Sequence, residues 1–150
     1  MLADFGLATA ESAKSYIYVR CGTPGFAAPE ILLSKQGGSQ KCISDMFSVG
    51  IVVYFMIFRK LPYRGTNVAD ISRQNRKCDF EFSDNITDKM DPFLVDLMLR
   101  MIDADPEKRI TPEGALQHLY FTRNLSEQAT TKPLEENISE CYRELNRMQR

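Results

Sequence analysis

Two short motifs near the start of the chain carry residue types that can do chemistry, and they frame a stretch rich in hydroxyl groups. Asp4-Phe5-Gly6 places a carboxylate, which suits a hard cation, beside an aromatic ring and a flexible glycine. Ala28-Pro29-Glu30 follows, and between the motifs lie the hydroxyl residues Thr9, Ser12, Ser15, Tyr16, Tyr18 and Thr23. A phosphate on such a hydroxyl orders a loop when an arginine pairs with it. An isolated aspartate is more often a turn or cap residue, so each motif is weak alone.

The elements expected to position these motifs are helices, because apolar residues recur at helical spacing and no segment clearly predicts a strand. Residues 1–28 lack a sustained period and are expected to form a loop. A short helix is expected from Pro29 to about Ser34, with proline at its start. Capping residues at Thr66 or Asn67, Asp91 and Thr111 predict further helices over Val68–Lys77, Phe93–Ile102 and 112 to about 119. The last of these is expected to turn Ala115, Leu116 and Leu119 inward.

The most apolar stretch of the chain runs from Met46 to Phe58 and is expected to form a central helix. It is shorter than the roughly 20 apolar residues that a membrane span needs. A helix without a polar face must be wrapped on every side. Any side left without neighbours is therefore expected to expose apolar side chains, which favours dye binding and poor solubility.

The composition is typical of a soluble globular domain, with 43% hydrophobic and 26% charged residues. The net charge of −1 gives no electrostatic footprint for nucleic acid. Four cysteines without a C-x-x-C pair, together with a single histidine, lack the signatures of zinc and haem sites. No secretory signal is visible. We therefore expect reduced thiols, a cytoplasmic location, and neither a nucleic-acid nor a membrane partner.

In this order and spacing, the motifs resemble the second half of a eukaryotic Ser/Thr protein kinase domain, from the activation segment to the last helix of the C-terminal lobe. The most specific stretch is Cys21-Gly-Thr-Pro-Gly-Phe-Ala-Ala-Pro-Glu30, which is similar to the family pattern G-T-x-x-Y-x-A-P-E. The resemblance implies a mainly α fold, a partial protein-kinase-like C-lobe with a C-terminal tail helix. It implies a partial kinase domain over residues 1–121, a linker over 122–133 and a terminal helix over 134–150.

For the first motif, the resemblance implies a role at the phosphates of ATP. Asp4 would hold Mg²⁺ against these phosphates, Phe5 would pack under the active site, and Gly6 would let the triplet switch between states. Thr23 matches a residue that hydrogen-bonds near the catalytic aspartate in Ser/Thr kinases. The implied reaction is transfer of the γ-phosphate of ATP to Ser and Thr hydroxyls of protein substrates.

The resemblance also implies a substrate platform, formed by Thr23, Gly25, Phe26 and Ala27, for the residue that follows the phosphoacceptor. Phe26 stands where the family usually has tyrosine, which removes a hydroxyl group and one expected hydrogen bond. The commonest phosphorylation site of the family is occupied by Val19, so simple activation by phosphorylation is not expected.

Three further residues have structural roles by resemblance. Glu30 and Arg109 match a buried ion pair between the activation segment and the late part of the lobe. Asp45 matches the aspartate at the head of the central helix that braces the catalytic loop, although a plain helix-capping carboxylate would look the same. Phe47 stands where the family usually has tryptophan.

Kinases carry a glycine-rich phosphate cover, a lysine and a catalytic-loop aspartate before the Asp-Phe-Gly triplet, but only Met1-Leu2-Ala3 precede it here. No catalytic base is therefore assigned, and residues 1–150 alone are expected to be inactive. Two interpretations stay open: part of an ATP- and Mg²⁺-dependent Ser/Thr kinase, or a non-catalytic interaction module derived from one. A helical scaffold with accidental motifs is disfavoured, because the landmarks occur in the family order.

Two regions outside the motifs have weaker predictions. The 59–77 stretch holds the basic residues Arg59, Lys60, Arg64, Arg73, Arg76 and Lys77 against Asp70. It could dock an acidic partner, although such charge blocks are more often solvated helix faces. Near the C-terminus, apolar residues recur at helical spacing at Leu134, Ile138, Cys141, Leu145 and Met148. This segment is too short to predict a coiled coil and is expected to pack onto the lobe.

Overall fold

The structure, a computed structural model, describes residues 3–12, 22–34, 41–80 and 90–123. Its helices are α1 (Pro29–Leu33), α2 (Ile43–Phe58), α3 (Val68–Lys77), α5 (Pro92–Met101), α6 (Pro112–Leu116) and α7 (Leu119–Thr122). These described ranges contain no strand, so the predicted mainly α fold is confirmed. None of the helices in this part of the chain is long and apolar enough to cross a membrane.

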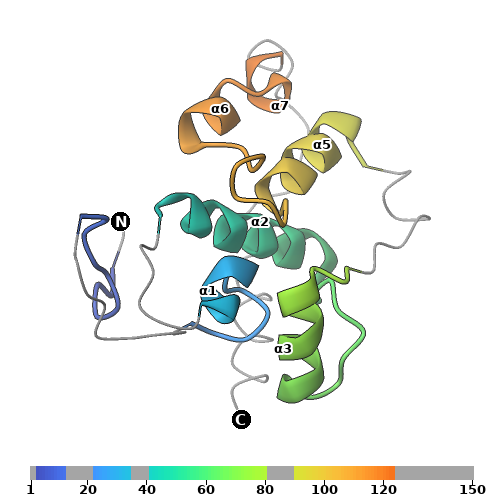
Figure 1. Ribbon diagram of the computed structural model, residues 1–150. Coiled ribbons are helices and arrows are strands. Elements are labelled where there is room, and N and C mark those ends of the chain that lie inside the picture. The colour runs from blue at the N-terminus through green and yellow to red at the C-terminus, as the bar shows by residue number, and fades with distance from the viewer. Residues whose placement is uncertain (1–2, 13–21, 35–40, 81–89, 124–150) are drawn as a thin grey trace.

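Helix α2 crosses the middle of the molecule, with α1 and α3 on one side and α5, α6 and α7 on the other (Figure 1). Helix α5 packs on α2, α1 packs against α3, and α7 packs against α5. Residues 3–12 lie beside this helical body, near the N-terminal end of α2 (Figure 1). The arrangement makes α2 the support on which the other elements are placed.

The side chains of α2 enter two hydrophobic clusters, which explains why the helix has no continuous polar face. Phe47 and Ile51 pack in the first cluster together with Ala28 and Ile102. The second cluster contains Met46, Leu97, Met101 and Ala115. Burial of such side chains is the main favourable term in the stability of the fold. The prediction of a central core helix is therefore confirmed.

A third side of α2 is partly exposed in the described part of the chain. Val49, Val52 and Met56 have exposed fractions of 45%, 43% and 36%. They follow one another at helical spacing and so lie along one stripe of the helix. This is the exposed apolar flank that the sequence predicts.

Close contact between α2 and the C-terminal end of α5 depends on Gly50. A Cβ atom added at this position would lie 2.6 Å from Cγ2 of Ile102 and 2.7 Å from Cβ of Met101. Real side chains do not approach so closely. Glycine is therefore required here for packing between the helices.

The start of α2 differs from the prediction. The helix begins at Ile43 rather than Met46, and Cys42, not Asp45, occupies the N-cap position, without a side-chain capping bond. Asp45 lies in the first turn and is exposed. The early start is held by distant partners, since Ser44 binds Glu30 and Arg109 binds the carbonyl of Ile43.

The other capping predictions are confirmed. Asn67 accepts a hydrogen bond from the amide of Asp70 at 2.9 Å, Asp91 accepts one from Phe93 at 2.9 Å, and Thr111 accepts one from Gly114 at 3.1 Å. Each cap satisfies an amide that the helix itself leaves without a partner.

The single helix expected from 112 to about 119 is instead split into α6 and α7. His118 interrupts it with an extended backbone, and its Nδ1 caps α7 by accepting from the amide of Tyr120 at 3.2 Å. The break at His118 redirects Leu119, whereas Leu116 precedes it, on the exposed side of α6. Leu116 and Leu119, expected to point inward, are 73% and 56% exposed, and only Ala115 is buried as expected.

The predicted linker and terminal helix lie almost wholly outside the described residues. Thr122, the first residue of the predicted linker, belongs to α7. Residues 124–150, which include the predicted helix over 134–150, are not described.

Candidate functional site

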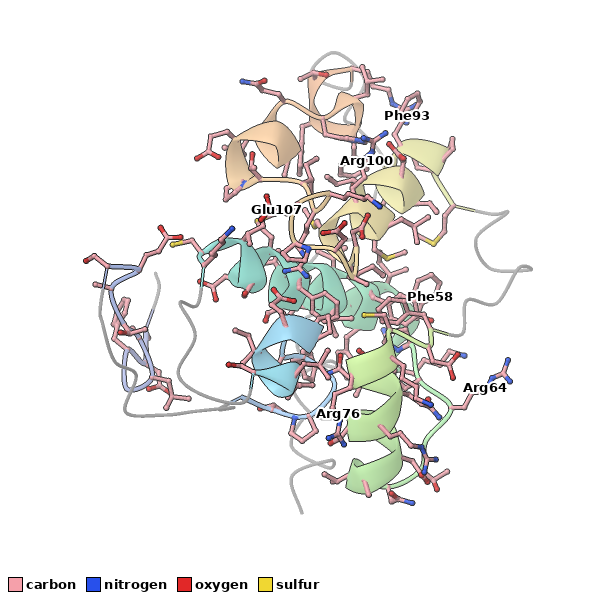
Figure 2. All side chains as sticks on the ribbon, in the orientation of Figure 1. Phe58, Arg64, Arg76, Phe93, Arg100 and Glu107 are labelled. Atoms are coloured by element: carbon pink, nitrogen blue, oxygen red, sulfur yellow. The ribbon has the colours of Figure 1, made fainter. Side chains whose placement is uncertain are left out.

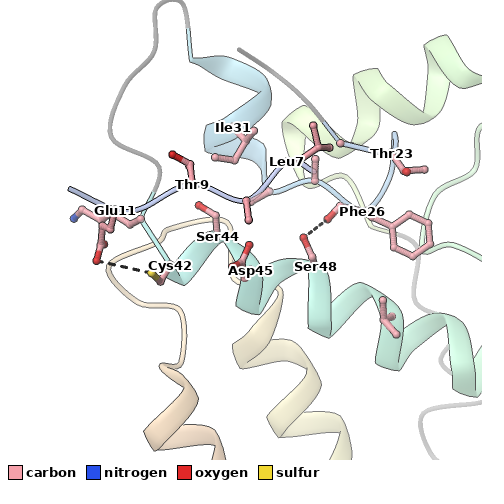
Figure 3. Close-up of a pocket in the computed structure, with 16 residues that line it drawn as sticks. Leu7, Thr9, Glu11, Thr23, Phe26, Ile31, Cys42, Ser44, Asp45 and Ser48 are labelled. Atoms are coloured by element: carbon pink, nitrogen blue, oxygen red, sulfur yellow. Dashed lines mark hydrogen bonds between the residues drawn. The ribbon is translucent and has the colours of Figure 1, made fainter. Parts of the chain in front are cut away.

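A pocket of about 520 Å³ lies between residues 7–11, the stretch from Gly22 to Ile31, and the N-terminal part of α2 (Figure 3). Its polar lining comes from Thr9, Glu11, Thr23, Lys41, Ser44, Asp45 and Ser48. The apolar lining includes Leu7, Phe26, Ile31 and Val52. Segments distant in the sequence therefore meet at one concave surface.

Four of the predicted site residues line this pocket: Thr23, Phe26, Ala27 and Asp45. Asp45 approaches it from the first turn of α2 (Figure 3). The structure thus brings the predicted platform together with the predicted brace. It does not bring the Asp-Phe-Gly triplet to the same pocket.

The triplet forms a turn on the exposed segment 3–12. Asp4 has a φ angle of 63°, in the left-handed region that aspartate tolerates better than most residues. Its Oδ1 accepts a long hydrogen bond of 3.4 Å from the amide of Gly6. Phe5, expected to pack under the active site, is 69% exposed. Leu7, Ala8 and Thr9 of the same segment line the pocket instead.

The platform has a defined backbone conformation. The amides of Phe26 and Ala27 both donate to the carbonyl of Thr23, at 3.0 and 3.3 Å. Gly25 has a φ angle of 90°, and a Cβ atom there would lie 2.9 Å from Cδ1 of Leu61. Only glycine suits this position, because both the conformation and the space exclude a larger residue.

Three successive carbonyl groups of the platform each accept a hydrogen bond from a side chain. Tyr63 donates to Gly25 at 3.2 Å, Ser48 to Phe26 at 2.9 Å (Figure 3), and Asn75 to Ala27 at 3.0 Å. The phenyl ring of Phe26 packs 6.3 Å from the ring of Phe55, between centroids.

Immediately after the platform, Glu30 on α1 forms the predicted ion pair with Arg109. The Arg109 side chain is fully buried, and its two terminal nitrogens lie 2.7 and 3.0 Å from the two Glu30 oxygens. Arg109 also donates to the carbonyls of Ile43 and Asp103, at 3.1 and 3.0 Å. Its guanidinium lies 5.2 Å from the ring centroid of Phe47, where the family usually has tryptophan.

The pKa of Glu30 is lower than its ordinary value of 4.5. Burial alone would raise this pKa, but hydrogen bonds from Arg109, from the backbone and from Ser44, together with the charge of Arg109, outweigh burial. Glu30 is therefore ionised at neutral pH. The pair fastens the end of the platform to the head of α2 and to the loop after α5.

Sequence reasoning missed four residues that hold the platform and the ion pair: Ser44, Ser48, Tyr63 and Asn75. Ser48 gave a signal, since it interrupts the apolar run with a hydroxyl group. Asn75 did not stand out, because most of the other residues of α3 are polar too. Only the fold shows that both side chains turn inward.

The basic residues of the 59–77 stretch do not gather on one surface. Arg64 and Arg76 point to opposite sides of α3 (Figure 2). Arg73 forms an ion pair with Asp70 at 2.6 Å, and Arg76 donates to the carbonyl of Ser72. Docking of an acidic partner on this stretch stays a prediction.

Comparison with known proteins gives the family. The protein kinase domain matches residues 1–121. The chain belongs to this family. This confirms the expected partial C-lobe of a protein kinase.

Individual relatives agree with this assignment. Probable serine/threonine-protein kinase 2 of Plasmodium falciparum is 32% identical over 95% of this chain and 26% of its own length. Calcium/calmodulin-dependent protein kinase type 1 of Macrobrachium nipponense is 32% identical over 93% of this chain and 39% of its own length. The chain thus spans between a quarter and two-fifths of these relatives. The twitchin kinase region of C. elegans shares the fold, with a TM-score of 0.70 and 24% identity over 95% of this chain and 25% of that one.

Proposed function

We propose that residues 1–121 supply the activation segment and C-terminal lobe of a Ser/Thr protein kinase, which transfers the γ-phosphate of ATP to hydroxyl groups of protein substrates. The observation that carries the proposal is the fixed platform at Thr23 to Ala27, in a chain that belongs to the protein kinase domain family. Thr23 and the similarity to a serine/threonine-protein kinase support Ser and Thr as the acceptors.

ATP and Mg²⁺ are part of the proposal. No cluster of three His, Cys, Asp or Glu side chains in the described part of the chain could hold a metal with protein ligands alone. Mg²⁺ in phosphoryl-transfer sites needs only one or two carboxylates, because phosphate oxygens and water complete its shell. The exposed Asp4 fits this requirement and would hold Mg²⁺, while bound ATP supplies the phosphoryl group.

The described residues would act by holding a peptide, not by moving a proton. The platform presents a preformed surface, which lowers the entropic cost of placing an acceptor hydroxyl. The Glu30–Arg109 pair keeps that surface attached to α2 and so has a structural role. We also propose a cytoplasmic location, which suits the free thiols of Cys42 and Cys78.

The platform can be tested by nuclear magnetic resonance on ¹⁵N-labelled residues 1–150. The protein is titrated with a peptide pool that has a central Ser or Thr and degenerate flanking positions. We expect shifts to concentrate on the amides of Thr23, Gly25, Phe26 and Ala27, and to be weaker with a pool that has a central Tyr. Absence of shifts, or shifts confined to α3, would contradict the proposal.

A further inference from the structure

We propose that Tyr63 and Asn75 are positioning residues of the peptide platform, which fix its backbone from behind through the carbonyls of Gly25 and Ala27. The inference rests on the function proposed for the platform. Both residues lie outside the activation segment, on the connection after α2 and on α3. Their effect on a peptide would therefore be exerted through the platform.

Asn75 is fully buried, and its amide group has a single consistent orientation. Its Nδ2 donates to the carbonyl of Ala27 at 3.0 Å, because a carbonyl oxygen can only accept. Its Oδ1 is left to accept a hydrogen bond, and the Tyr63 hydroxyl lies 2.8 Å away. Asn75 thus links the platform to Tyr63.

Tyr63 completes the network with one proton and two acceptors. Its hydroxyl oxygen lies 2.8 Å from Oδ1 of Asn75 and 3.2 Å from the carbonyl of Gly25, so the two acceptors share the proton. Burial raises the pKa of Tyr63 far above its ordinary value, which keeps the phenol protonated at neutral pH. Tyr63 as a whole is 9% exposed, and its ring centroid lies 5.7 Å from that of Phe80.

The network acts where the platform most needs support. Gly25 has a φ angle of 90°, and its carbonyl direction depends on this uncommon conformation. Ser48 holds the next carbonyl from α2, at 2.9 Å. The amides of Phe26 and Ala27 bond Thr23, so the polar backbone groups at the platform are held by the protein itself. A peptide would then meet a surface whose shape is already fixed.

A buried polar network is stabilising only when every member has its partner, and a half-satisfied one is worse than an apolar pair. Tyr63→Phe leaves Oδ1 of Asn75 and the Gly25 carbonyl without a donor, and Asn75→Leu leaves the Ala27 carbonyl without one. Either single removal should therefore release the platform, whereas the double variant leaves only the two carbonyls unpaired, fewer than the sum of the single variants. The variants are Tyr63→Phe, Asn75→Leu and the double variant. Tyr120→Phe, which removes a hydroxyl on α7, is the matched control.

Two readouts are measured on residues 1–150: hydrogen exchange at the amides of Phe26 and Ala27, and affinity for the Ser/Thr peptide pool. Each single variant should speed this exchange and weaken peptide affinity by at least roughly tenfold, the effect of leaving a buried polar group unpaired. The double variant should lose less than the product of the two single effects. Tyr120→Phe should change neither readout. Leu97→Ala is a second control, because it removes a buried side chain on the other side of α2. In the molecules of this variant that stay folded, both readouts should remain at the parent level.

Unchanged exchange and affinity in Tyr63→Phe would overturn the inference, and so would equal losses in Leu97→Ala. Tyr63→Phe conserves volume, so it decides the question even if Asn75→Leu does not fold. If the parent chain binds no peptide, the proposed function fails. Hydrogen exchange then still shows whether Tyr63 and Asn75 order the platform.

Discussion

The Glu30–Arg109 ion pair gives the sharpest stability prediction. Glu30→Gln keeps the size of the side chain and removes its charge, so the fully buried Arg109 is left with two backbone carbonyls and a neutral amide oxygen. Removing one charge of a buried pair typically costs about 3–5 kcal/mol. The Glu30 side chain keeps 28% exposure, which allows some relief by water, so we expect a loss at the lower end, about 3 kcal/mol.

The loss can be measured by urea unfolding of residues 1–150 at pH 7, followed by circular dichroism at 222 nm. The slope of the transition should stay constant while its midpoint falls. Glu107→Gln is the matched control, because it removes the same charge from the exposed Lys41–Glu107 pair and should leave the midpoint unchanged. A loss below about 1 kcal/mol for Glu30→Gln, the range of a surface pair, would show that Arg109 does not depend on Glu30 as a buried partner.

Four further results are expected. Because the pKa of Glu30 is lower in the folded state than its ordinary value of 4.5, the ionised carboxylate contributes fully to the free energy of unfolding above pH 4.5. This contribution disappears as the pH falls through the lower folded pKa. Glu30→Gln should therefore remove part of the acid sensitivity of stability seen in urea titrations. Purified residues 1–150 should transfer no phosphate from radiolabelled ATP, and label on a Ser/Thr peptide that Asp4→Asn abolishes would contradict this. Val52→Glu should lower binding of a hydrophobic dye, and unchanged binding would place the exposed apolar surface elsewhere. Gly50→Ala gains about 1 kcal/mol of helix propensity but overpacks the α2–α5 contact by about 1–3 kcal/mol, so thermal unfolding should show a net loss of roughly 1 kcal/mol.

Local signals in the sequence predicted most of the elements. The apolar run, the capping side chains Asn67 and Asp91, and the prolines at helix starts depend on neighbours only a few residues away, so they are readable without a fold. The start of α2 was misplaced because its first turn is held by Arg109, far away in the sequence. The break at His118 was missed because a side-chain cap in mid-pattern has no periodic signature.

The candidate site divides in the same way. The pairing of Glu30 with Arg109 followed from the family resemblance, and the structure shows its geometry. The support of the platform by Tyr63 and Asn75 could not be predicted from the sequence, because side-chain hydrogen bonds to backbone carbonyls leave no sequence motif. Phe5 was expected to be packed, yet it is exposed, since other side chains of its segment face the pocket.

The central claim is best tested by phosphoryl transfer in a chimera. Residues 4–121 replace the matching stretch of the calcium/calmodulin-dependent protein kinase type 1 of Macrobrachium nipponense, and incorporation of label from ATP into Ser/Thr peptides is measured with Mg²⁺, Ca²⁺ and calmodulin present. We expect label on Ser or Thr that the Asp4→Asn chimera does not produce. A folded chimera that binds ATP and transfers no phosphate would contradict it, and retained peptide binding would then favour a non-catalytic interaction module.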